Sequence, residues 1–169
     1  MSRNSRQAIS KLAAIAACLG VLVLTSPSAT AQDEPRNKAI AIVVHKNTGV
    51  ENLSLEELRN IFLANQQFWA DRTRIILLVR APKSEERDFV LNRIYQMDEA
   101  QFQQYWIAKM FRAEVPRGPK IVFSTDMTLE LVLAIPGSIS FISADEVTDN
   151  VQVVRIDGKL PSDQGYPLK

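Results

Sequence analysis

The fold of this chain is decided by the stretch from Ile75 to Phe89, which reads IILLVRAPKSEERDF. The continuous apolar run from Ile75 to Val79 predicts a strand that is covered on both faces, as in a sheet flanked by helices. Pro82 stops this strand from continuing, and Ser84 is placed to cap a helix that extends to about residue 96. The stretch therefore predicts a strand, a turn and a helix in direct succession.

The segments on either side repeat this alternation. Ser54 and Glu57 have the spacing of a capping box, which marks the start of another helix. Strands that alternate with helices predict an α/β fold, with a mixed sheet flanked by helices. The expected strands are 39–44, 75–79, 121–123, 139–142 and 151–156, and the expected helices begin near residues 54, 84, 98 and 126.

Apolar spacing at helical and strand periods also predicts the hydrophobic core. Phe102, Trp106 and Met110 recur at intervals of four and are expected on one helix face. We expect Trp106 to be a core residue and not a platform for a ligand, because aromatic stripes are more often buried than functional. The predicted core comprises Leu58, Ile61, Phe62, Ile76, Leu78, Phe102, Trp106 and Phe141.

The first 31 residues predict a cleavable signal peptide. A basic start is followed by an apolar run and by the small-x-small sequence Ala29-Thr30-Ala31, so cleavage is expected after Ala31. Cys18 offers an alternative, since the residues before it resemble a lipoprotein box, but the most apolar stretch lies beyond it. The expected organisation is a signal peptide (1–31), a polar lead-in (32–38) and one domain (39–169), located in the periplasm.

Several classes of function are disfavoured by composition. Without the signal peptide the chain carries 17 basic and 19 acidic residues, which does not favour a nucleic-acid partner. His45 is the only histidine, and the one cysteine lies in the signal peptide, so no histidine or thiolate metal cluster is expected. We therefore predict a protein that is not an enzyme and that has no metal and no cofactor.

Arg80 and Ser84 are the candidate ligand-binding residues. Free N–H groups and a serine hydroxyl at a helix start form a natural oxyanion site, and a nearby guanidinium can add a bidentate contact. The same residues have a purely structural interpretation, in which Ser84 caps its own helix and Arg80 is a solvated strand end.

The chain also resembles the phosphate-binding protein family of ATP-driven (ABC) transporters, a branch of the type 2 periplasmic binding fold. The resemblance runs from about residue 39 to residue 169, nearly the whole chain after the signal peptide, and implies a single lobe of that fold. Its marks, in order, are Asn52 to Phe62 (NLSLEELRNIF), Trp69, Arg80 to Phe89, Tyr105-Trp106 with Phe111, and Pro136 to Phe141 (PGSISF).

The resemblance implies that Arg80 and Ser84 hold the oxygens of a phosphate. Glu85 and Glu86 stand where the family has a glycine and a hydroxyl residue, and two carboxylates in the first helical turn repel a bound anion. If the site binds an oxyanion, both carboxylates are expected to point away from it. The four residues Arg80, Ser84, Glu85 and Glu86 together form the predicted ligand-binding set.

Two functional hypotheses follow from the resemblance. The first is a periplasmic substrate-binding-like protein that binds phosphate or another small oxyanion at the Arg80/Ser84 helix start. Its partners would be a transporter permease or another periplasmic or membrane protein, and a second copy of the chain could complete the site. The alternative is a periplasmic interaction or sensory domain that kept the lobe and lost phosphate binding.

Overall fold

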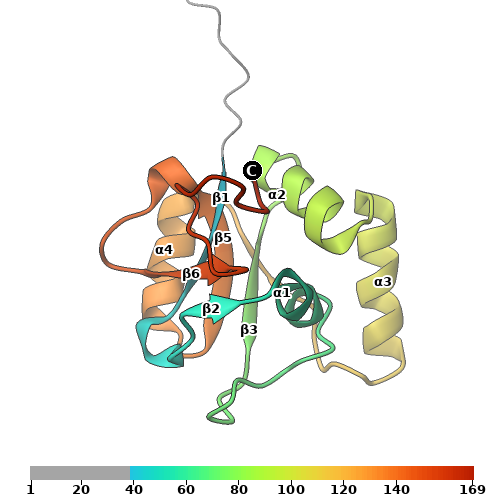
Figure 1. Cartoon of the computed structure of the whole chain (residues 1–169). Helices are drawn as coiled ribbons and strands as arrows, with labels where there is room; N and C mark the ends of the chain where they lie inside the picture. Colours follow the sequence, from blue (N-terminus) through green and yellow to red (C-terminus); the bar gives the residue numbers. More distant parts are fainter. Residues whose placement is uncertain (1–38) are drawn as a thin grey trace, which may run out of the picture. The chain divides into compact units, whose positions relative to one another are not determined.

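Strands and helices alternate along residues 39–169, which are the part of the chain that the computed structural model describes (Figure 1). The predicted signal peptide and lead-in lie outside these residues. The strands are β1 (Ile40–Val44), β2 (Asn52–Leu53), β3 (Ile76–Arg80), β4 (Lys120–Val122), β5 (Ser138–Ser143) and β6 (Gln152–Ile156). The α-helices are α1 (Leu55–Phe62), α2 (Glu85–Val90), α3 (Glu99–Phe111) and α4 (Thr125–Ala134), and α2 continues as a π-helix, η2 (Leu91–Tyr95). Short 3₁₀ turns are η1 (Lys46–Thr48) and η3 (Ala144–Glu146).

The strands form one mixed sheet in the order β2-β6-β1-β5-β3-β4. β1 runs antiparallel to both β5 and β6, whereas β3 runs parallel to β4 and β5. The predicted fold class, a mixed sheet flanked by helices, is confirmed.

Helices cover both faces of this sheet, with α4 on one side and α1, α2 and α3 on the other (Figure 1). Alternate residues of β1 point to opposite faces, so Ile42 joins the core beneath α1 and α3, and Val43 joins the core beneath α4. Every residue of β1 is buried, as the continuous apolar run predicted.

Side-chain caps determine where the helices begin. The predicted capping box of α1 is present, since Ser54 Oγ accepts from the N–H of Glu57 while the Glu57 carboxylate accepts from the N–H of Ser54. Ser84 caps α2 as expected. A second capping box, formed by Asp98 and Gln101 at the start of α3, was not recognised in the sequence.

Three details differ from the sequence-based expectation. β2 is absent from the expected strands, because two residues show no periodicity and the strand exists only through its parallel pairing with β6. Met110 is exposed, since the helix face that buries Phe102 and Trp106 loses its cover towards the end of α3. The predicted core residues are buried except Ile76, which is half-buried at the start of β3.

Within residues 39–169, no helix combines the length and the apolar character needed to cross a membrane.

Gly137 is required by the packing of the turn before β5. Its φ is +78°, its carbonyl oxygen accepts from Trp69 Nε1 at 2.9 Å, and an added Cβ would collide with the carbonyl oxygen of Arg74. We therefore expect Gly137→Ala to lower the free energy of unfolding by about 2–3 kcal/mol, because left-handed strain and a backbone clash act together.

Gly158→Ala is the matched control for the Gly137 substitution. Gly158 has a φ of +77°, but a Cβ there would meet no atom within 4 Å, so only the strain of about 1–2 kcal/mol should remain. Urea unfolding of both variants measures the difference, and equal losses would show that the turn relaxes around the added methyl group.

Candidate anion-binding site

The candidate site lies where β3 and β4 end side by side. Arg80 pairs with Val122 in the parallel ladder, and the N–H of Ala81 donates to the carbonyl oxygen of Val122 at 2.8 Å. A helix begins soon after each strand, with Ser84 capping α2 and Ser124 capping α4. The positive ends of two helix dipoles therefore lie at the same edge of the sheet.

Arg80 is largely buried at this edge, with 12% of its side chain exposed. Its Nε and Nη1 atoms are shielded from solvent and have no hydrogen-bond partner among the described residues. The Glu86 carboxylate lies 3.8 Å from Arg80 Nε, which is an ion-pair contact but is too long for a hydrogen bond. Buried donors without an acceptor are costly, so this guanidinium has unused capacity to bind an anion.

The predicted site residues are only partly brought together. Glu86 contacts Arg80 instead of pointing away from it, whereas Glu85 is exposed. Ser84 Oγ accepts from the N–H of Arg87 at 3.2 Å, so Ser84 caps α2 as its structural interpretation predicts. The hydroxyl proton of Ser84 is left to act as a donor.

Arg87 holds the site in place and was given no role by the sequence analysis. It is 2% exposed, and its Nη1 donates to the carbonyl oxygen of Arg80 at 2.6 Å. Its Nε and Nη2 donate to the two carboxylate oxygens of Glu99 at 2.8 and 2.9 Å. These hydrogen bonds from Arg87 hold the pKa of Glu99 below its usual value.

The guanidinium of Arg87 also lies 4.6 Å from the ring centroid of Phe102. The fully buried side chain of Arg87 therefore links the end of β3 to α3 through hydrogen bonds and an aromatic contact. No local pattern distinguishes it from the surface arginines of the chain, because its partners Glu99 and Phe102 come from the next helix.

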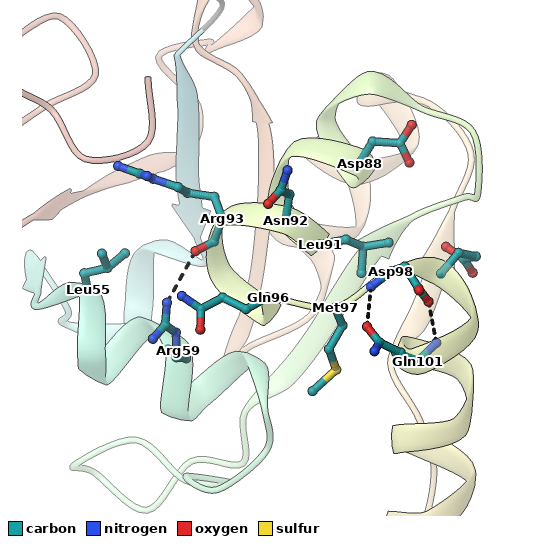
Figure 2. A pocket seen from close by; sticks show the side chains of 11 residues that line it. Leu55, Arg59, Asp88, Leu91, Asn92, Arg93, Gln96, Met97, Asp98 and Gln101 are labelled. Atoms are coloured by element: carbon teal, nitrogen blue, oxygen red, sulfur yellow. Dashed lines mark hydrogen bonds between the residues drawn. The ribbon is translucent and has the colours of Figure 1, made fainter.

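A broad concavity of about 860 Å³ lies between α1 and the turn that joins η2 to α3 (Figure 2). Its lining includes neither Arg80 nor Ser84. Arg59 Nε already donates to the carbonyl oxygen of Ile94 at 2.9 Å, and the polar groups of Asp98 and Gln101 close the capping box of α3. Since these charged and polar groups already form hydrogen bonds at helix ends, Arg80 remains the stronger candidate for binding an anion.

No family model and no curated protein matches the chain by sequence. Solved structures do match. An ABC-type phosphate transport receptor from Vibrio cholerae is 19% identical with a TM-score of 0.62, and the match covers 78% of this chain and 53% of that one. PstS from Borrelia burgdorferi is 16% identical with a TM-score of 0.59, covering 74% and 49%. A phosphate-binding protein from Stenotrophomonas maltophilia is 15% identical with a TM-score of 0.55, covering 73% and 40%.

The matches thus span about half the length of these structures or less. At identities below a quarter they establish a shared fold. The chain has the mixed α/β fold found in part of the phosphate-binding proteins of ABC transporters.

Proposed function

We propose that this protein is a non-enzymatic binding module for phosphate or another small oxyanion, with Arg80 as its principal ligand residue. The observation that carries the proposal is the buried guanidinium of Arg80, whose Nε and Nη1 have no hydrogen-bond partner among the described residues. The shared fold supports the same assignment, since the similar structures are named as phosphate-binding or phosphate-transport proteins.

The first turn of α2 supplies the remaining donors. The N–H of Arg87 is used by the Ser84 cap, and the N–H of Asp88 donates to the carbonyl oxygen of Ser84 at 3.0 Å. The N–H groups of Glu85 and Glu86 precede these and have no intrahelical acceptor, as in the first turn of any helix. An oxyanion beside Arg80 would accept from them and from the Ser84 hydroxyl.

Glu86 acts in this proposal as an internal competitor. Its carboxylate already neutralises part of the Arg80 charge at 3.8 Å, so an incoming anion must displace it or tolerate its repulsion. We therefore propose that the natural chain binds phosphate weakly.

We expect Glu86→Gln to tighten phosphate binding by about tenfold or more, because the competing charge is removed at nearly constant side-chain volume. Isothermal titration calorimetry at low salt measures the affinity. Glu85→Gln is the matched control, since it removes the same charge from the same turn but at an exposed position that forms no ion pair with Arg80.

Adding Arg80→Gln to the Glu86→Gln variant should abolish the gain. Equal effects of the two glutamate substitutions would assign the change to the general field of the helix start. Absence of phosphate binding in both the natural protein and the Glu86→Gln variant would refute the proposed function.

We further propose that the protein works in the periplasm with a transport permease. The description of the Vibrio cholerae structure as a transport receptor supports this assignment. The similar structures also contain about as much chain again beyond the matched part, which is consistent with a ligand shell completed by a partner or a second copy.

A further inference from the structure

A second and smaller cavity lies at the opposite end of β3 from Arg80. It has a volume of about 130 Å³ and is lined by the chain entering β3 and by the segment that leads from α3 to β4. β3 runs from Ile76 to Arg80, and this cavity contacts its first residues, so the two sites lie at opposite ends of this strand.

The floor of this cavity is apolar. Leu77, Trp106 and Val115 line it and are each at most 9% exposed. An apolar protein cavity of about 150 Å³ is large enough to hold benzene, so a compact ring or branched alkyl group matches this volume.

The rim of the cavity is basic. Arg74, Arg117 and Lys120 are exposed lining residues, and none of them forms an ion pair with another residue of the described chain. No Asp or Glu lines the cavity. Three cations without a facing carboxylate create a positive potential over an apolar floor.

Trp106 adds an unpaired hydrogen-bond donor to the floor of the cavity. Its indole Nε1 is buried and has no hydrogen-bond partner among residues 39–169. Tyr105 and Phe102 pack edge-on against its ring, which accounts for its role in the core, and the same side chain also lines the cavity.

We propose that this cavity binds a small carboxylate with a compact apolar body, such as an aryl carboxylate. The apolar body lies on the floor formed by Leu77, Trp106 and Val115, and the carboxylate contacts the basic rim. Inorganic phosphate has no apolar body and therefore does not compete. The proposal is independent of anion binding at Arg80, which lies at the other end of β3.

The test uses benzoate and the two indole N–H signals of the ¹⁵N-labelled protein. Trp69 and Trp106 are the only tryptophans in the chain, so NMR spectra contain one reporter at the cavity and one internal control. We expect benzoate to shift the Trp106 signal saturably and to leave the Trp69 signal, whose N–H is bonded to Gly137, nearly unchanged. Benzyl alcohol should bind more weakly, and phosphate should not displace benzoate.

The double variant Arg117→Gln/Lys120→Gln should weaken benzoate binding by about tenfold, since each lost contact is charge-assisted. Lys46→Gln/Arg155→Gln removes two exposed charges away from the cavity and should leave the affinity unchanged. The proposal fails if the Trp106 signal does not move at millimolar benzoate. It also fails if benzyl alcohol binds equally well, or if both double variants lose the same affinity.

Discussion

Replacing Arg87 by alanine is expected to lower the free energy of unfolding by about 3–5 kcal/mol. The substitution removes a side chain that is 2% exposed, together with its bidentate contact to Glu99 and its bond to the carbonyl oxygen of Arg80. It also leaves a void beside Phe102, over which the guanidinium lies. α2 and α3 would lose the contact that holds them to the end of β3.

Arg112→Ala is the control for this prediction. Arg112 also pairs with a carboxylate, that of Glu114, but 55% of its side chain is exposed, so its loss should cost less than about 1 kcal/mol. Urea denaturation followed by circular dichroism compares the two variants. A loss below 1 kcal/mol for Arg87→Ala would mean that water replaces the guanidinium at little cost.

Replacing Trp106 by alanine is expected to cost about 3–5 kcal/mol as well, through a different mechanism. Trp106 is 5% exposed, and its ring centroid lies 6.2 Å from that of Phe102 and 5.8 Å from that of Tyr105, both in edge-on arrangements. Truncation removes a large buried apolar area and disrupts two aromatic contacts at once.

Ile107→Ala serves as the neighbouring control, since Ile107 follows Trp106 on the same helix but is 62% exposed. Its substitution should change the free energy of unfolding by less than about 0.5 kcal/mol. The same denaturation experiment applies, and comparable losses at the two positions would show that α3 is not anchored through Trp106.

Most of the fold could be predicted from the sequence, because its signals act over a few residues. The apolar run before Arg80 defines a doubly covered strand, and Ser54 with Glu57 defines a helix start. These features depend on backbone geometry and on neighbours within one turn, so the order of strands and helices along residues 39–169 follows from them. The position of Arg80 at a strand end and of Ser84 at a helix start could be read in the same way.

The relations among distant segments were decided by the tertiary structure. Arg87 becomes a buried link between β3 and α3 only because α3 brings Glu99 and Phe102 against it. The contact of Glu86 with Arg80 depends on how the turn after β3 positions the first turn of α2, and the residue types alone favoured repulsion from the anion over pairing with the arginine. β2 exists through its pairing with β6, and the cavity that Trp106 lines is assembled from separate segments. In each case the deciding contact joins residues that local periodicity does not relate, because the packing of helices on the sheet determines which side chains meet.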